Sequence, residues 1–212
     1  MGDIDGTRTR VAELERQALA DLLLKVGPDA PTLCEGWTTR DLAAHLVVRA
    51  TRPDAAAGIL IKRLAGHTRR VQARVAAGDW ERLVEAVRRR PWWAALGDEA
   101  VNRVEYFIHH EDVRRAQADW QPRELPHDIE AALWSRIPAM ARLVLRRTPA
   151  AVTVSAPGHG SVTAGRGGRS VRLSGPPSEL LLFLSGRQEH ARVDLTGPDE
   201  VVARMRRARY GI

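Results

Sequence analysis

Cysteine is nearly absent from this sequence, which excludes two common kinds of stabilisation. Cys34 is the single cysteine among 212 residues, so the chain has neither an intramolecular disulfide nor a cysteine-rich zinc cluster. Cys34 is a candidate reactive thiol or soft metal ligand, although a cysteine near a loop is more often a small packing residue. Long apolar runs are also lacking, because no segment approaches the roughly 18 apolar residues of a membrane span. The N-terminus has no apolar signal segment, and we expect a cytoplasmic protein without membrane contact.

Lysine is almost as scarce as cysteine. Lys25 and Lys62 are the only lysines among 33 basic residues, so the other 31 are arginines, and the formal net charge is +7. Such a charge invites a nucleic-acid interpretation. The arginines are nevertheless scattered along the chain and are not interleaved with aromatic residues, as a nucleic-acid-binding surface would require. We therefore treat a basic nucleic-acid-binding protein as the least favoured hypothesis.

Helical periodicity dominates the first 148 residues. Residues 8–26 carry apolar side chains at helical spacing, and Gly27-Pro28 ends that helix. Thr38 and Asp41 have the spacing of a capping box, in which the two side chains satisfy free amides at the start of the next helix. Further helices are expected at residues 68–77, 80–90, 101–116 and 129–147, the last with a kink at Pro138.

Beyond Pro149 the periodicity changes from helical to alternating. Three short segments alternate apolar with small or polar residues and are separated by glycine-rich turns: 151–156, 161–164 and 170–174. A helix at 178–185, a strand at 192–195 and a helix at 199–209 are expected to follow. The sequence thus predicts an α+β protein, with a helical bundle of about four main helices in residues 1–148 and a small α/β domain in residues 149–212.

The segment 101–116, VNRVEYFIHHEDVRRA, places three polar groups on one side of its predicted helix. At about 100° per residue, Glu105, His109 and Asp112 fall at roughly 0°, 40° and 340°, whereas His110 points elsewhere. A glutamate and a histidine four residues apart can bind one cation, and the aspartate can hydrogen-bond the other nitrogen of the histidine ring. Taken alone, the pattern also suits the solvated face of an amphipathic helix.

His45 supplies the second signal, because it lies inside the apolar run 42–48, which is expected to be buried on most sides. A single histidine in such a run is typically a core residue with a hydrogen-bond partner. Paired with Glu105 and His109, it completes a site of two histidines and one carboxylate. Three ligands leave a position for water or substrate, as in catalytic zinc sites. These donors suit Zn²⁺, Ni²⁺ and Fe²⁺ alike.

Several motifs in this sequence resemble a known family. Gly36-Trp37-Thr38 with Asp41, Ala44-His45-Leu46, and Glu105-x-x-x-His109-x-x-Asp112 look like the metal-binding domain of the mycothiol-dependent maleylpyruvate isomerases, a branch of the DinB-like four-helix bundles. The segment 175–182, GPPSELLL, resembles the start of the small domain, similar to sterol carrier proteins, that follows the bundle in that family. Residues 33–37 and 109–115 look most like an actinobacterial subfamily known mainly as metal-binding proteins of undefined activity.

The resemblance implies a set of site residues and cofactors. The family's metal ligands fall on His45, Glu105 and His109, with Asp112 behind them, and His110 is a candidate substitute ligand. The cofactors implied are a divalent metal, zinc before nickel or iron, and the thiol mycothiol. Arg49 and Arg52 continue the helix that carries His45 and are candidates to meet an anionic substrate, although a solvated surface is the commoner role for such residues.

The resemblance also implies an activity. The founding enzymes isomerise maleylpyruvate to fumarylpyruvate by adding a thiolate to an electrophilic carbon, which allows bond rotation before the thiolate leaves. We accordingly expect a mycothiol-dependent isomerase or a thiol S-transferase, with a small thiol and a small electrophile as partners. Because one fold hosts many functions, a non-catalytic metal-binding or stress-response module remains the alternative.

Overall fold

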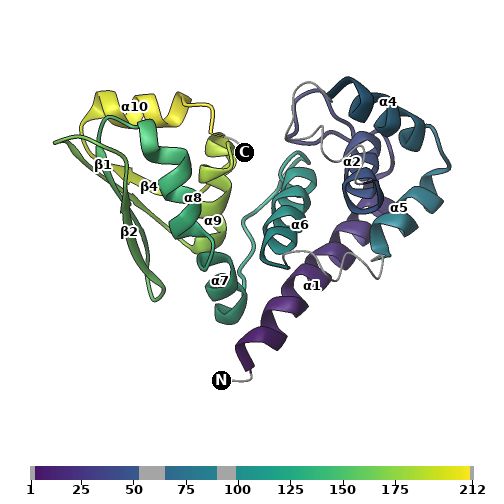
Figure 1. Ribbon diagram of the computed structural model, residues 1–212, viewed down its shortest axis with the longest axis horizontal. Coiled ribbons are helices and arrows are strands. Elements are labelled where there is room, and N and C mark those ends of the chain that lie inside the picture. The colour runs from purple at the N-terminus through teal and green to yellow at the C-terminus, as the bar shows by residue number, and fades with distance from the viewer. Residues whose placement is uncertain (1–2, 53–64, 90–98, 211–212) are drawn as a thin grey trace. The chain divides into compact units, whose positions relative to one another are not determined.

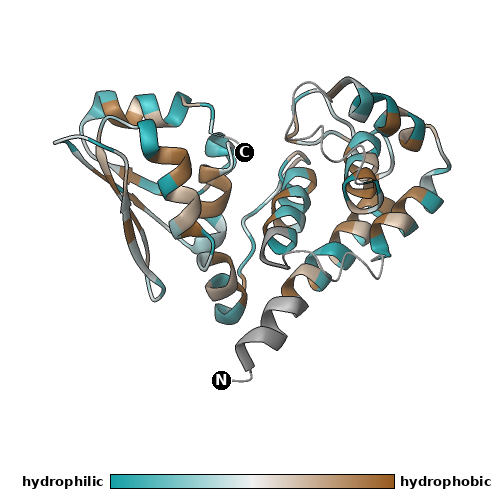
Figure 2. Cartoon of the chain, in the orientation of Figure 1, coloured by the Kyte–Doolittle hydropathy of each residue, from teal (hydrophilic) through white to brown (hydrophobic). Residues whose placement is uncertain are grey.

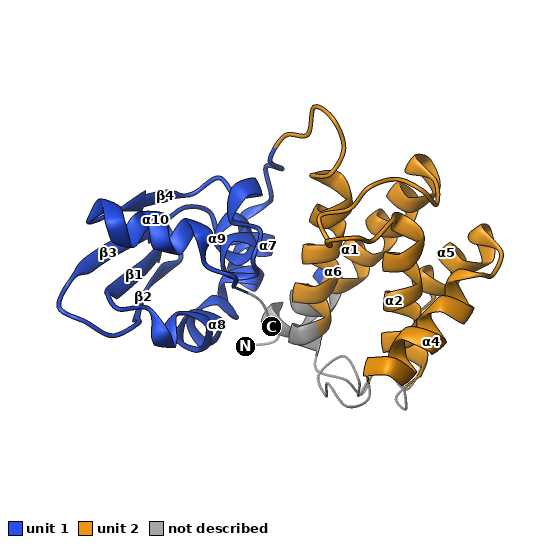
Figure 3. Ribbon diagram, turned by 90° about the horizontal axis from the view of Figure 1, so that it is seen from above, with its two compact units in different colours: residues 1–11, 122–212 blue, residues 12–121 orange. Residues whose placement is uncertain are grey.

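The computed structural model describes residues 3–52, 65–89 and 99–210. The chain divides into two compact units, one of residues 12–121 and the other of residues 1–11 together with 122–212 (Figure 3). Both helices and a small sheet are present, which confirms the predicted α+β class. Within the described ranges, no helix is both long and apolar enough to cross a membrane.

The unit of residues 12–121 is helical (Figure 1). Its elements are the part of α1 (Asp3–Val26) from residue 12 onward, α2 (Thr39–Thr51), α4 (Ala65–Ala76), α5 (Trp80–Arg88) and α6 (Glu99–Arg114). Buried apolar residues from four of them form one core: Leu19, Ala20, Leu23, Leu42, Ala43, Leu46, Leu83, Val84, Val87 and Val113. The helices predicted in this part of the chain are confirmed, with ends that differ by a few residues.

The start of α2 is fixed by the predicted capping box. The Thr38 side chain accepts a hydrogen bond from the Asp41 amide, and the Asp41 carboxylate accepts one from the Thr38 amide at 3.1 Å. These bonds satisfy backbone donors that the first helical turn leaves free. Apolar residues dominate the helix that follows (Figure 2), and Leu42, Ala43 and Leu46 lie in the core. The cap and the apolar face together fix where His45 lies.

The other unit is built on a four-stranded sheet. Its strands are β1 (Ala151–Ala156), β2 (Gly160–Ala164), β3 (Ser170–Ser174) and β4 (Asp194–Thr196), in the order β2-β1-β3-β4. The pair β1 and β3 is parallel, and the other two pairs are antiparallel. Alternate residues such as Val152, Val154 and Leu173 are buried, as the sequence alternation predicted.

Helices cover the buried side of this sheet. Two of this unit's helices, α8 (Ile137–Val144) and α9 (Pro177–Leu184), contact its strands. The unit also contains α7 (His127–Trp134), α10 (Asp199–Arg207) and short 3₁₀ turns at Leu145–Arg147 and Gln188–His190. The helix α8 contacts β2, while α9 contacts α7, α8 and β1. By these contacts, α7 and α8 pack with α9 and the sheet. The domain boundary that the sequence places after Thr148 stays a prediction.

The single long helix predicted at 129–147 is interrupted. The helix α7 ends at Trp134 and α8 begins at Ile137. A proline ring in a helix clashes with the carbonyl four residues earlier, which for Pro138 is that of Trp134. The interruption therefore lies one turn before the proline, where the carbonyl must turn away.

A buried carboxylate ties α7 to α9. The helix α9 begins after Pro176, which offers no side-chain cap. Glu130 of α7 supplies one instead, because its Oε2 accepts a hydrogen bond from the Ser178 amide at 2.8 Å and its Oε1 accepts one from the Ser178 hydroxyl at 2.7 Å. A carboxylate at this position also interacts favourably with the helix dipole.

Glu130→Ala should lower the free energy of unfolding by about 2–3 kcal/mol, because hydrogen bonds to a charged group contribute about 1.5–3 kcal/mol and the Ser178 donors would stay buried. Glu130→Gln keeps one acceptor and should cost less. The matched control is Glu124→Ala, which removes an exposed carboxylate and should change stability by less than about 0.5 kcal/mol. Chemical denaturation followed by circular dichroism measures all three. Equal losses for Glu130→Ala and the control would contradict the capping role.

Candidate metal centre

The helices α2 and α6 lie side by side (Figure 1) and bring three predicted site residues together. Oε1 of Glu105 lies 3.5 Å from Nε2 of His45 and 3.3 Å from Nε2 of His109. The two imidazole rings are 5.4 Å apart between centroids and meet edge to face. Both histidines are buried, whereas Glu105 is partly exposed. One carboxylate oxygen and two ring nitrogens thus converge from two helices.

The spacing of these atoms fits donors around one cation. Both histidine–glutamate contacts are long for N–H···O hydrogen bonds, which usually measure about 2.7–3.2 Å. Two donors bound at about 2.0–2.1 Å to one tetrahedral zinc lie about 3.3 Å apart. By the same geometry, the ring centroids of two zinc-bound imidazoles are about 5 Å apart. The chemistry and the spacing of the three donors therefore both fit a divalent metal.

Asp112 lies on the far side of the His109 ring. Its Oδ2 accepts a hydrogen bond from Nδ1 of His109 at 3.0 Å, and the aspartate is fully buried. When Nδ1 carries the proton, the lone pair of a neutral ring lies on Nε2, which faces Glu105 and His45. The role predicted for Asp112, orienting a ligand without binding the metal, is compatible with this geometry.

Cys34 belongs to a second, overlapping group. Its thiol donates to Oδ2 of Asp112 at 3.2 Å and lies 3.9 Å from Nδ1 of His109. Both groups, Cys34 with His109 and Asp112, and His45 with Glu105 and His109, have donor atoms close enough for one ion. They use opposite nitrogens of His109. The 3.0 Å contact between His109 and Asp112 in the group with Cys34 has the length of an ordinary hydrogen bond, whereas the donors of the group with His45 and Glu105 are more widely spaced.

The electrostatics of the site follow from these contacts. Burial raises the pKa of the Glu105 carboxyl, but hydrogen bonds with His109 and His45 and the charges of His109 and Arg49 outweigh burial and hold that pKa well below its usual range. Burial lowers the pKa of His109, yet hydrogen bonds with Asp112, Cys34 and Glu105 raise it well above its usual value. These contacts favour the charged forms of both side chains, so a cation bound at His109 would compete with a proton for the ring.

Two further residues contact the site, and sequence reasoning identified only one of them as a candidate. Nε of Arg49 lies 3.4 Å from Oε1 of Glu105, and its position one turn after His45 is the signal that pointed to it. Arg52, the other candidate, lies just after the end of that helix and is exposed. Trp37 was unexpected here, and its ring lies 5.1 Å from that of His45.

His110 turns away from this site. Its Nδ1 lies 2.7 Å from Oε2 of Glu15 on α1, and both residues are buried. The structure thus gives His110 a carboxylate partner on another helix and does not bring it to the three convergent donors. Nothing in the sequence of α1 identified Glu15, because the pairing depends on how α1 and α6 pack.

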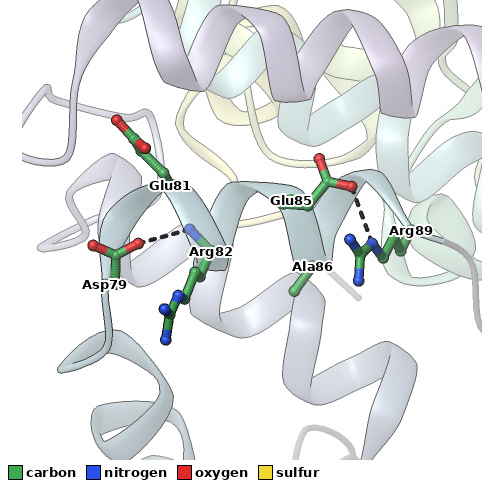
Figure 4. A pocket seen from close by; sticks show the side chains of 6 residues that line it. All are labelled: Asp79, Glu81, Arg82, Glu85, Ala86 and Arg89. Atoms are coloured by element: carbon green, nitrogen blue, oxygen red, sulfur yellow. Dashed lines mark hydrogen bonds and ion pairs between the residues drawn. The ribbon is translucent and has the colours of Figure 1, made fainter.

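A separate hollow lies on the surface of α5 (Figure 4). The Asp79 carboxylate there accepts from the Arg82 amide at 2.9 Å, and Arg89 donates to Glu85 at 3.0 Å. The carboxylates of Asp79 and Glu85 therefore have partners within the same helical segment. We interpret this hollow as the solvated face of α5. Its lining residues are Asp79, Glu81, Arg82, Glu85, Ala86 and Arg89.

Two solved crystal structures share the fold of this chain. One is that of a histidine-to-alanine mutant of the mycothiol-dependent maleylpyruvate isomerase, with 16% sequence identity and a TM-score of 0.60. The other is that of the mycothiol-dependent maleylpyruvate isomerase, with 19% identity and a TM-score of 0.54. Each comparison covers 89% of this chain and 91% of the other. No family model and no curated protein matches the sequence. At these identities the likeness shows the fold.

A double-mutant cycle tests the partner found for His110. Glu15→Gln and His110→Gln should each destabilise the protein, and their coupling should be about 1.5–3 kcal/mol, as for a buried hydrogen bond to a charged group. The reference is the exposed pair Glu85 and Arg89, whose coupling should be about 0.3–0.5 kcal/mol. Chemical denaturation of each variant gives both values. A coupling near zero for the buried pair would show that His110 does not depend on Glu15.

Proposed function

We propose that this protein binds one divalent metal through His45, Glu105 and His109 and acts as a mycothiol-dependent isomerase or a thiol S-transferase on a small electrophile. The observation that carries the proposal is the convergence of two imidazole nitrogens on one carboxylate oxygen at 3.3 and 3.5 Å. Zinc is the metal we favour, with nickel and iron as alternatives. The metal would act as a Lewis acid that stabilises the thiolate form of a bound thiol.

The chain's own residues would each have a distinct task. Asp112 holds the proton of His109 at Nδ1 and keeps Nε2 directed at the site. Glu105 supplies a negative charge that lowers the cost of burying a cation. The tryptophan ring of Trp37 packs beside His45 and helps to exclude water from it. The histidines thus form the buried side of the site, and the partly exposed Glu105 lies at its open side.

The shared fold supports the choice of reaction. The solved structures with this fold are described as mycothiol-dependent maleylpyruvate isomerases, and their likeness extends over 89% of this chain. On this basis we further propose that the helical unit corresponds to a DinB-like four-helix bundle and the sheet unit to a domain similar to sterol carrier proteins. A small thiol and a small electrophile would then be the protein's partners, in the cytoplasm.

Metal analysis of protein purified without a histidine tag tests the ligands. The wild type should hold about one metal per chain, and a His45→Ala, His109→Ala double variant should hold essentially none, since one remaining donor cannot retain the ion. The His110→Gln variant is the matched control and should keep its metal. If the wild type and the double variant are both free of metal, the proposed site is wrong.

Cobalt substitution then tests the chemistry. A small thiol added to the cobalt form should produce a thiolate-to-cobalt charge-transfer absorption, because the open position accepts the sulfur. If the cobalt absorption does not change when thiol is added, the result would favour the alternative, a metal-binding module without thiol chemistry.

Substitution of Asp112 distinguishes the two overlapping donor groups. Asp112→Asn should weaken zinc binding by about 10–100-fold, the usual effect of removing a carboxylate that orients a histidine ligand. Cys34→Ala should have a much smaller effect, because it leaves the bond between Asp112 and Nδ1 of His109 in place. Competition with a chromophoric chelator measures both affinities. A loss for Cys34→Ala as large as that for Asp112→Asn would instead place the metal in the group of Cys34, His109 and Asp112.

A further inference from the structure

Arg49 shares the carboxylate oxygen that both histidines face. It lies on α2 one turn after His45, and its Nε is 3.4 Å from Oε1 of Glu105. Its Nη1 donates to Oδ1 of Asn102 on α6 at 3.0 Å. These two contacts hold the guanidinium beside the proposed metal site, whereas Arg52, the residue after the end of α2, is exposed.

Once a metal is bound, the site would contain no negative charge left over to balance the positive charge of Arg49. The carboxylates of Glu105 and Asp112 would balance the two charges of a divalent cation, and both histidines would be neutral as ligands. The guanidinium would then remain as one positive charge in a partly buried setting. A buried charge is costly unless an opposite charge accompanies it. The loaded site should therefore attract an anion.

Arg49 also has hydrogen-bonding capacity to offer such an anion. A guanidinium has five N–H donors in a planar fork that suits a carboxylate. Within the part of the chain that the structure describes, no hydrogen bond involves its Nη2. The side chains of Arg49 and Glu105 are 21% and 27% exposed, against 9% and 11% for His45 and His109. A ligand entering from solvent would therefore meet the arginine at the open side of the site.

We propose that Arg49 is an anion-binding residue that selects ligands with a carboxylate next to the group that binds the metal. This inference rests on the proposed function and deepens it, because it names the residue that would set ligand preference at the same site. A purely structural alternative is that Arg49 only orients Glu105. The two roles predict different effects of an Arg49 substitution on the affinity for the metal. Loss of an orienting residue would weaken metal binding, whereas loss of a neighbouring positive charge would leave it unchanged or make it tighter.

A pair of small thiols provides the test. Mercaptoacetate and mercaptoethanol both offer one sulfur to the metal, but only mercaptoacetate carries a carboxylate. Each is titrated into cobalt-loaded protein, and the thiolate-to-cobalt absorption gives its affinity. For Arg49→Met, the ratio of mercaptoacetate to mercaptoethanol affinity should fall about tenfold or more relative to wild type, the loss expected from one charged hydrogen bond. Arg52→Met, which removes the same charge three residues further along, should keep the wild-type ratio.

A second variant keeps the test decisive. Arg49→Lys retains the charge but not the planar fork, so its ratio should fall between those of wild type and Arg49→Met. An unchanged ratio in Arg49→Met, with or without weaker cobalt binding, would overturn the anion-binding role. Wild-type protein that binds no cobalt would instead overturn the proposed function itself, which makes the two failures distinguishable.

Discussion

The polar site depends on a single constraint: His45 and His109 are buried, and a buried imidazole needs partners. Glu105 meets this need for both rings, because its Oε1 faces Nε2 of each. The apolar residues around His45 pack α2 into the core, so the helix cannot turn this histidine towards solvent without exposing them. The hydrophobic core thus forces α2 and α6 to satisfy each other's polar groups, and that pairing creates the convergent donors.

The sequence predicted the local features of this site well and its long-range partners poorly. The spacing of Glu105 and His109 defines one side of a helix whatever the tertiary structure, and the capping box at Thr38 requires only four consecutive residues. The pairing of His110 with Glu15 joins residues 95 positions apart. The contact between Cys34 and Asp112 likewise depends on how a loop is held against α6. Periodicity carries no information about such contacts.

The same distinction applies to the fold. The alternating residues after Pro149 predicted three strands at nearly their observed positions, because period-two burial is a local property of a sheet. The capping of α9 by Glu130 could not be foreseen, since α9 has no side-chain cap of its own and the carboxylate comes from 48 residues earlier. Pro138 did predict a disturbance of the helix, but the break lies one turn before the proline, where its ring would clash with an earlier carbonyl.

The two sides of the His109 ring differ in what a bound metal would have to displace. Asp112 is fully buried and accepts from Nδ1 at hydrogen-bond distance, so the proton on that nitrogen is held where water cannot compete. A metal at Nδ1 would have to replace this proton and would leave Glu105 and Arg49 as the remaining charged pair. A metal at Nε2 keeps the buried bond to Asp112 and uses the side of the ring that faces the partly exposed Glu105. Burial therefore assigns the proton to one nitrogen and makes the other available.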